Sequence, residues 1–572
     1  MADFFKRPGW VPWWAMVLAV SLAACLYGSR VIFPTHFAWM LHGDAAQHLN
    51  GMAFFLSEPW HWPAGLIDGF GGPGSVVFTD SIPWLALFLK GVRWPSDWQP
   101  FGIWFLMCHG LAAALSVVWF QIHRVGALVA VCYAVVLAFA PTLLLRVYGH
   151  EALMAHFLIP GALILSSRPW SPWRWGLWLL LSLGIHAYWV VMVGALALAA
   201  ALHAGWSGSS RWHRLALDGL GIGVVMLACA YLLGYGAGDG SRSSEGFGYY
   251  SANMLSWFDP MDWLGFLKFH GMQTVNAGEW SLAFGSVGQS SAGQYEGFAW
   301  LGGGILGLGF FVLIFQLRRF WMRPRAAGGG PSLSEMAPWM TWFAALVLAL
   351  WSWSHVWGWG STILVSWPLP ASWMSVLGVF RASGRFIWPL TWLLMLFICL
   401  SAARWRHAWV WASLALLVQW VDLSPKLAEF HLRFRSQVPG AVAPLSSPVW
   451  LPLLQRCNHL ALLSPRVQDG TYWAPAAWLA AQAKASMHPA PTARLTSLRE
   501  SEMQSLIEAL AVGERWNPAH VYLIWAEALP PATVRSLVAA SELALPARQV
   551  LSLEGYLVIA AGSCFSSPHK GH

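Results

Sequence analysis

The sequence predicts a polytopic α-helical membrane protein of about 11 transmembrane helices with a soluble α/β domain at its C-terminal end. The chain is 57% hydrophobic and only 10% charged, which is too apolar for a soluble globule. Apolar runs long enough to cross a bilayer of roughly 30 Å recur between residues 11 and 421. From about residue 440 onward, charged residues, Ser and Pro occur at frequencies typical of soluble domains. We therefore expect a transmembrane domain at 1–430 and an exterior domain at 440–572.

Each long apolar run is interpreted as one span. The expected spans are 11–28, 101–120, 125–145, 152–167, a pair within 174–205, 215–235, 298–317, 338–357, 386–402 and 408–421. The run at 81–92 is too short to cross alone and predicts a helix lying along the membrane surface. The first span has no convincing cleavage site after it and is expected to be a permanent anchor.

The basic residues indicate the orientation of these spans, because cytoplasmic loops are enriched in Lys and Arg. With the N-terminus inside, the basic loops all fall on the cytoplasmic side of an eleven-span chain. The sequence pI of about 9.2 therefore reports topology and does not indicate nucleic-acid binding. The same count places large loops at 29–100 and 236–297, and the C-terminal domain, outside.

Most carboxylates and imidazoles of interest lie in the outer loops, so the sequence predicts one polar site at the outer face. These residues are Asp44, Asp80, His150, Glu151, His186, Glu279 and Glu296.

Asp44 is the acidic residue nearest the outer end of the first span, and His48 follows it by one helical turn. A carboxylate at this position can deprotonate an attacking hydroxyl or hold a cation. The alternative is a helix cap, because Asp is a good N-cap residue. A Gly-rich stretch of the same loop ends in Asp80.

Two further segments place polar groups at membrane depth or at its rim. "RVYGHEALMAH" carries His150 and Glu151 at the outer end of a span. "GIHAYW" interrupts two short apolar halves, which favours His186 and Tyr188 as cavity-lining residues, although a simple turn with interfacial aromatics is the alternative.

Glu296 precedes one span, and Arg381 and Arg385 enter another from the outer side. These arginines break the charge bias of the outer loops. A guanidinium binds phosphate oxygens through two parallel hydrogen bonds, so Arg385 in particular predicts a phosphate ligand at the lipid boundary. The alternative is a salt bridge to a nearby carboxylate.

The C-terminal domain shows strand-like runs at 459–463, 521–525 and 555–561, and helical periodicity over "SLRESEMQSLIEAL". It has no glycine-rich phosphate fingerprint, so we expect it to pack over the outer face or bind a partner. Cys457 and Cys564 are its only cysteines, and they can form a disulfide in an oxidising compartment.

The phrases "GDAAQHLNG", "TDSIPW", "YGHEALMAH", "QYEGF", "ASGRF" and "QWVDLSP" resemble an uncharacterised bacterial branch related to the C-type (GT-C) membrane glycosyltransferases. That family uses polyprenyl-phosphate sugars as donors. The resemblance implies an acidic base in the first outer loop, here Asp44, and a second acidic position at Asp80 or Glu151. No adjacent acidic pair is evident in the first loop, so the need for a divalent cation stays open.

The resemblance therefore predicts transfer of a sugar from a polyprenyl-phosphate donor to a glycan, lipid or protein acceptor. The reaction would take place at the outer face of a bacterial inner membrane, with the C-terminal domain periplasmic. His48 or His150 would orient the base. Two alternatives are a transporter or flippase of a lipid-linked saccharide and a non-catalytic scaffold for polysaccharide assembly. A transporter should show inverted repeats or charges deep within several spans, and neither is evident.

Overall fold

The computed structural model describes residues 9–237, 246–261, 280–322, 336–435, 444–464, 470–490, 496–525 and 528–565. The chain divides into two compact units. The first, here called the helical unit, contains Met1–Ile32, Phe101–Leu227 and Arg242–Pro439. The second, the mixed unit, contains Phe33–Pro100, Ala228–Ser241 and Gly440–His572.

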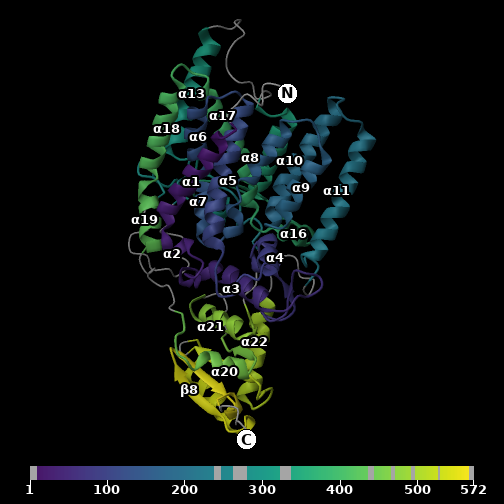
Figure 1. Ribbon diagram of the computed structural model, residues 1–572, viewed down its shortest axis with the longest axis vertical. Coiled ribbons are helices and arrows are strands. Elements are labelled where there is room, and N and C mark those ends of the chain that lie inside the picture. The colour runs from purple at the N-terminus through teal and green to yellow at the C-terminus, as the bar shows by residue number, and fades with distance from the viewer. Residues whose placement is uncertain are drawn as a thin grey trace. The chain divides into compact units, whose positions relative to one another are not determined.

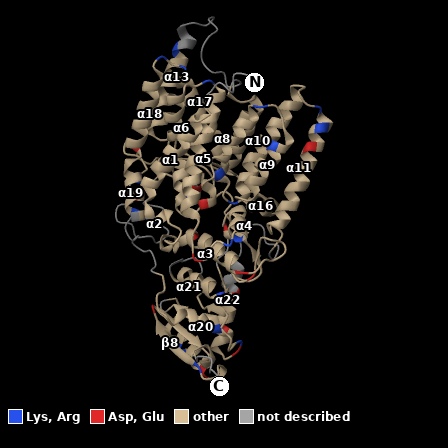
Figure 2. Ribbon diagram, in the orientation of Figure 1, with Lys and Arg blue, Asp and Glu red and all other residues tan. Residues whose placement is uncertain are grey.

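The helical unit is a bundle of mostly apolar helices, as expected of helices buried in lipid or protein. Charged residues are sparse along it (Figure 2). Its main helices (Figure 1) are α1 (Val11–Tyr27), α5 (Phe101–Ile122), α6 (Ala127–Ala138), α8 (Leu158–Ser166), α9 (Pro172–Leu183), α10 (Ala187–Trp206), α11 (Trp212–Leu232, whose last turns belong to the mixed unit), α13 (Gly303–Met322), α15 (Trp339–Ser352), α17 (Trp388–Ala403), α18 (Ala408–Asp422) and α19 (Ser424–Arg435).

Shorter elements connect these helices. They are α2 (Ser29–Ile32), α7 (Pro141–Leu144), η3 (Leu145–Val147), η4 (Glu151–Met154), η5 (Ala292–Gly297), β3 (Val356–Trp359), β4 (Thr362–Ser366), α16 (Ala371–Leu377), η6 (Gly378–Phe380) and η7 (Ser383–Ile387). The strands β3 and β4 form an antiparallel hairpin.

The prediction of a mostly helical chain with several apolar helices is confirmed. Among the described residues, five helices are long and apolar enough to cross a membrane: Phe101–Ile122, Ala127–Val147, Ala187–Trp206, Trp212–Leu232 and Ser383–Ala403. Helices also stand at the other expected spans, but their apolar parts are shorter, and the count of eleven stays a prediction. In the expected span 125–145, α6 ends before Pro141, because proline cannot donate the backbone hydrogen bond that would continue the helix.

The C-terminal part of the mixed unit is an α/β layer domain. Its five-stranded sheet has the order β6-β5-β7-β9-β8, built from β5 (His459–Leu462), β6 (Ser486–His488), β7 (His520–Trp525), β8 (Gln549–Leu553) and β9 (Tyr556–Ala560). The strands β6, β5 and β7 are parallel, and β8 and β9 add an antiparallel hairpin. The three strands expected from the sequence are β5, β7 and β9.

The helices of this domain are α20 (Trp450–Arg456), α21 (Gly470–Ala483), α22 (Thr496–Ala511) and α23 (Pro531–Ala544). The predicted helix over "SLRESEMQSLIEAL" is α22. Buried residues of α22 and α23, including Ile507 and Leu537, share one core with Tyr522 and Ile559 of the sheet. Leu523 and Val558 are also buried and, by strand alternation, point to the opposite face.

The first outer loop is built into the same unit. It contains η1 (Ala38–Met40), α3 (Gly43–Ser57), β1 (Leu66–Ile67), β2 (Gly74–Ser75), η2 (Val76–Thr79) and α4 (Pro83–Gly91). The run expected as a surface helix is α4. The helix α3 packs against α21, and Phe37 stacks on Trp478 with ring centroids 4.2 Å apart.

The loop also pairs with the free edge of the sheet. Met487 in β6 donates its backbone N–H to the carbonyl of Gly69 at 2.7 Å and accepts from the N–H of Gly71 at 2.9 Å. Residues 29–100 were expected within the transmembrane domain, whereas these contacts group residues 33–100 with 440–572. Apolar loop residues such as Phe54 and Phe70 account for this, because they are buried within the mixed unit.

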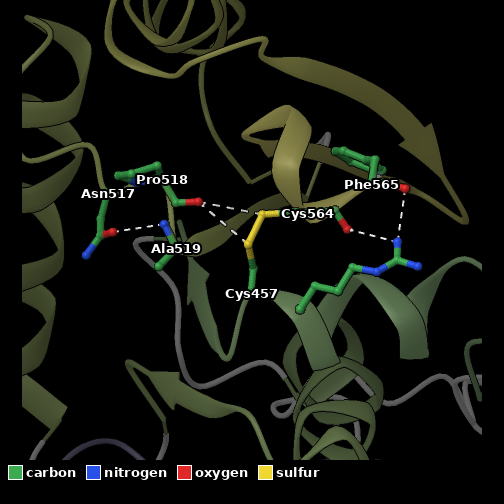
Figure 3. The surroundings of a disulfide bond; sticks show 7 residues. Cys457, Asn517, Pro518, Ala519, Cys564 and Phe565 are labelled. Carbon is green, nitrogen blue, oxygen red and sulfur yellow. Dashed lines mark hydrogen bonds between the residues drawn. A yellow bond between two sulfur atoms is a disulfide. The ribbon is translucent and has the colours of Figure 1, made fainter. Parts of the chain in front are cut away.

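Cys457 and Cys564 form a disulfide, as hypothesised from the sequence (Figure 3). The bond closes 107 residues of chain and joins the end of α20 to the segment after β9. Both sulfur atoms lie 3.6 Å from the carbonyl oxygen of Pro518. The disulfide therefore ties together the two ends of the C-terminal domain.

Replacing Cys564 with Ala should destabilise this domain by about 2–5 kcal/mol, because the unfolded chain regains the freedom of a long loop. The measurement is thermal unfolding of the purified chain, with Cys25→Ala, a change at a free cysteine, as the control. In unreduced, denatured protein we expect five of the seven cysteines to react with maleimide. Reaction of all seven would contradict the disulfide.

Candidate functional site

The predicted site residues belong to both units. The helical unit holds His150, Glu151, His186, Tyr188, Glu296, Arg381 and Arg385, and the mixed unit holds Asp44, His48 and Asp80. Glu279 lies outside the described residues. Each group is described within its own unit.

In the helical unit, the carboxylate of Glu296 lies between two buried arginines. Arg146 donates from Nη1 to Oε2 of Glu296 at 2.7 Å and from Nη2 to the backbone carbonyl of Glu296 at 3.1 Å. Arg385 donates from Nε to Oε2 at 3.0 Å and from Nη2 to Oε1 at 2.5 Å. The imidazole Nε2 of His150 lies 3.4 Å from Oε1. We call Arg146, His150, Glu296 and Arg385 the arginine cluster.

Short 3₁₀ turns position the three charged members of this cluster. Arg146 lies on η3, Glu296 on η5 and Arg385 on η7. The turns η5 and η7 can approach because glycines stand at the contact. A Cβ added to Gly384 would lie 2.7 Å from Cα of Gly297, too close for any side chain. The sequence "ASGR" therefore brings Arg385 to Glu296 through a backbone contact that only glycine permits.

Aromatic rings hold the guanidinium planes. The guanidinium carbon of Arg146 lies 4.8 Å from the ring centroid of Trp388, and that of Arg385 lies 4.6 Å from Tyr188. The hydroxyl of Tyr188 in turn accepts a hydrogen bond from the backbone N–H of Ala382 at 2.9 Å. Cation–π contacts of this kind fix orientation and stabilise a desolvated cation.

Two buried guanidinium groups share one carboxylate in the arginine cluster. Burial raises the pKa of Glu296, but the positive charges of Arg385 and Arg146 outweigh this and hold the pKa well below its usual range. Glu296 is therefore an anion. Within the described residues, Nε of Arg146 has no hydrogen-bond partner. A buried guanidinium N–H without an acceptor favours an additional ligand that accepts a hydrogen bond.

Arg385 makes a salt bridge to Glu296, which is the alternative expected from the sequence. The binding of phosphate by Arg385 stays a prediction. Arg146 belongs to the "RVYGHEALMAH" motif but is not among the site residues predicted from the sequence. The signal that identifies it is an arginine at the end of an apolar span, a position where charge is costly unless it is paired.

The remaining predicted residues of the helical unit lie in different settings. Glu151 is fully buried on η4, and its backbone carbonyl accepts from Nε1 of Trp104 at 2.8 Å. His186 caps α10, because its Nδ1 accepts from the N–H of Tyr188 at 3.2 Å. Arg381 is exposed, 5.4 Å from the ring centroid of Tyr250.

In the mixed unit, His48 is buried and its Nε2 lies 3.9 Å from Oδ2 of Asp80. Asp44 is exposed in the first turn of α3, where a negative charge is favourable to the helix dipole. The N-cap position itself belongs to His42. Asp80 is thus an acidic neighbour of His48 that the sequence did not predict. No group of three His, Cys, Asp or Glu residues is placed to hold a metal in the described part of the chain.

Glu296→Gln should destabilise the helical unit by about 3–5 kcal/mol, because it leaves two buried guanidinium groups without their anion. Thermal unfolding in detergent measures this loss. Asp218→Asn is the matched control, because it removes a carboxylate of the same unit while Asn keeps an acceptor for Nε1 of Trp170.

The same variant gives a pH dependence. A carboxyl group whose pKa is lower in the folded state stabilises the fold above its unfolded pKa of about 4.3. That stabilisation is lost as the pH falls through the folded pKa. The difference between parent and Glu296→Gln should therefore stay constant from pH 7 to 5 and shrink only in stronger acid. A difference that disappears by pH 6 would show that the ion pair does not hold the cluster.

No curated protein matches the chain, and no solved structure matches it. One family matches residues 16–424, a range that includes the first outer loop and ends before the C-terminal sheet. The chain therefore belongs to the family described as Domain of unknown function (DUF6311).

Proposed function

We propose that the protein transfers a sugar from a polyprenyl-phosphate donor to an acceptor at the outer face of a bacterial inner membrane. The observation that carries this proposal is the arginine cluster, in which two buried guanidinium groups share one carboxylate and Nε of Arg146 has no acceptor among the described residues. Arg146 ends the apolar helix Ala127–Val147, and Arg385 lies at the start of Ser383–Ala403. If these helices span the bilayer, both guanidinium groups lie at a boundary with the headgroups, where the phosphate of a lipid donor also lies.

The proposed sugar transfer requires the protein mainly to orient the donor and the acceptor. The bond between the anomeric carbon and the phosphate oxygen breaks, and its electron pair leaves with the lipid phosphate. A bond to the acceptor oxygen forms, and the acceptor proton passes to a base. Arg385 and Arg146 would stabilise the departing phosphate by charge-assisted hydrogen bonds. His150, Tyr188 and Arg381 are the neighbouring groups proposed to contact the donor.

The base is assigned by family resemblance. It falls on Asp44, with Asp80 and Glu151 as the other acidic candidates. The contact between His48 and Asp80 favours His48 as a positioning residue for Asp80. Glu296 is proposed to orient the two arginines, because both of its carboxylate oxygens are already engaged with them.

The disulfide supports the proposed orientation. Stable disulfides form in oxidising compartments such as the bacterial periplasm and are rare in the cytosol. The bond between Cys457 and Cys564 therefore favours a periplasmic C-terminal domain. The proposed N-terminus is cytoplasmic.

Topology is tested with a reporter fused after His572. Alkaline phosphatase, which folds only where disulfides form, should be active there. Green fluorescent protein exported through the same route should be dark. An inactive phosphatase fusion together with a bright fluorescent-protein fusion would overturn the proposed orientation. It would also overturn the assignment of the loops to the two sides of the membrane, on which that orientation rests.

Transfer is tested with the full chain in proteoliposomes that contain a polyprenyl-phosphate hexose labelled in the sugar. Arg385→Lys keeps the charge but loses the fork geometry, so it should weaken donor use about tenfold or more. Asp44→Asn should lower the rate by about two to four orders of magnitude if Asp44 is the base. Its effect on stability should stay below about 1 kcal/mol, the worth of a charge at a helix end.

If Asp44→Asn transfers sugar at the parent rate, the base must be sought at Asp80 or Glu151. Lipid that is bound but never consumed, with or without these variants, would favour the alternative of transporting a lipid-linked saccharide.

A further inference from the structure

A pocket of about 360 Å³ lies entirely within the mixed unit and belongs to none of the groups described above. Volumes of roughly 300–1,000 Å³ are typical of small-molecule sites. The first outer loop supplies Glu58, His61 and Asp68, and the C-terminal domain supplies Asn458, Lys484 and Ser486.

The acidic wall of the pocket has a fixed backbone. Glu58 follows the last residue of α3, and its two carboxylate oxygens accept the backbone N–H groups of Asp68 and Gly69, each at 2.9 Å. A Cβ on Gly69 would lie 2.8 Å from Oε1 of Glu58, so a side chain there would push into the carboxylate. Gly69 also accepts the edge hydrogen bond from Met487, which fixes this wall to the sheet.

An imidazole lies between two carboxylates at this wall. Nε2 of His61 is 3.3 Å from Oε2 of Glu58, and Nδ1 is 3.5 Å from Oδ2 of Asp68. The segment before it is held by Lys90, whose Nζ donates to the carbonyl of Pro59 at 3.0 Å. The polar groups are therefore positioned before any ligand arrives, which lowers the entropic cost of binding.

The lining identifies the kind of ligand. Carboxylates accept hydrogen bonds, Lys484 donates them, and Asn458 and Ser486 do both. A carboxylate has about four lone-pair sites, so Glu58 keeps acceptor capacity after binding two backbone groups. Two carboxylates would repel a phosphate or another anion. Donors and acceptors in such a mixture match the hydroxyl groups of a neutral sugar.

Apolar surface accompanies these groups, as expected for a sugar with a hydrophobic face. Phe54 and Pro59 line the pocket. Trp60 and Trp62 flank His61 in the chain and are 54% and 73% exposed. Exposed indoles offer a rigid apolar plane with one polar edge.

We propose that this pocket binds a neutral saccharide unit. The site is separate from the arginine cluster, and its binding is measured without turnover. Absence of the proposed transfer reaction would therefore not contradict saccharide binding in this pocket. Absence of saccharide binding in the pocket would likewise not contradict the transfer reaction.

The test uses the full chain in nanodiscs and ligand-observed saturation-transfer NMR. The probes are glucose, galactose, mannose, rhamnose and N-acetylglucosamine, each added alone, with glucuronate, inorganic phosphate and calcium chloride as contrasting probes. We expect at least one neutral sugar to bind and the contrasting probes not to bind at this site.

Two variants assign binding to the pocket. Asp68 is 60% exposed at its side chain and Lys484 is exposed, so Asp68→Asn and Lys484→Gln should fold as the parent does. Each should weaken sugar binding about tenfold or more, the effect of losing a charged hydrogen-bond partner. Glu542→Gln, at an exposed carboxylate of the same unit outside the pocket lining, is the control and should bind like the parent.

Three results would overturn the proposal. One is the failure of every neutral sugar to bind, and another is binding that both pocket variants leave unchanged. The third is binding of phosphate, glucuronate or calcium that Asp68→Asn or Lys484→Gln alters, because it would show that the pocket selects charge.

Discussion

The carboxylate of Glu296 is the group on which the polar part of the helical unit depends. A buried guanidinium costs several kcal/mol unless an anion and further hydrogen bonds compensate it, and Glu296 serves two of them at once. This contact requires η5 and η7 to approach at Gly297 and Gly384, and it places both arginines against aromatic rings. The packing of three separate turns is thus determined by one shared ion pair.

The same arrangement has a consequence for ligand binding. Glu296 is an internal anion, so in the proposed function an incoming phosphate would either add to the coordination of Arg146 and Arg385 or displace part of the carboxylate from them. The first route is favoured by Nε of Arg146, which has no hydrogen-bond partner among the described residues. Phosphate affinity and stability would then be coupled through Arg146, Glu296 and Arg385.

Local patterns in the sequence predict the elements well, because apolar runs and strand alternation are properties of neighbouring residues. The positions of α1, α5, α22, β5, β7 and β9 follow from such runs. The strand β6 has three residues and little pattern of its own, so it was not predicted. Its place in the sheet comes from pairing with β5.

The site was predicted less completely for a related reason. Glu296 is 150 residues from Arg146 and 89 from Arg385, and no local pattern encodes that these side chains meet. The sequence placed polar residues at the ends of spans but could not choose the partner of Arg385, and it left both phosphate and carboxylate open. For His48, spacing along α3 predicts Asp44 as a neighbour, and the fold of the loop also brings Asp80 within 3.9 Å, a contact that no local pattern encodes.

The C-terminal domain contacts the first outer loop, which carries the proposed base. The family match includes the loop and ends at residue 424, yet in this chain the loop is packed against residues beyond that limit. The helix α3 carries Asp44 and His48, and it lies on α21, with Nδ2 of Asn50 donating to the carbonyl of Ala474 at 3.3 Å.

The helix α21 in turn contacts β5 and β6 of the sheet, and the disulfide joins the end of α20, before β5, to the segment after β9. Without that support, buried loop residues such as Phe54 and Phe70 would face water, and burying a Phe side chain is worth roughly 1.5–3 kcal/mol. The C-terminal domain therefore has a definite physical role in this chain. It fixes the helix on which the proposed base and its histidine are carried.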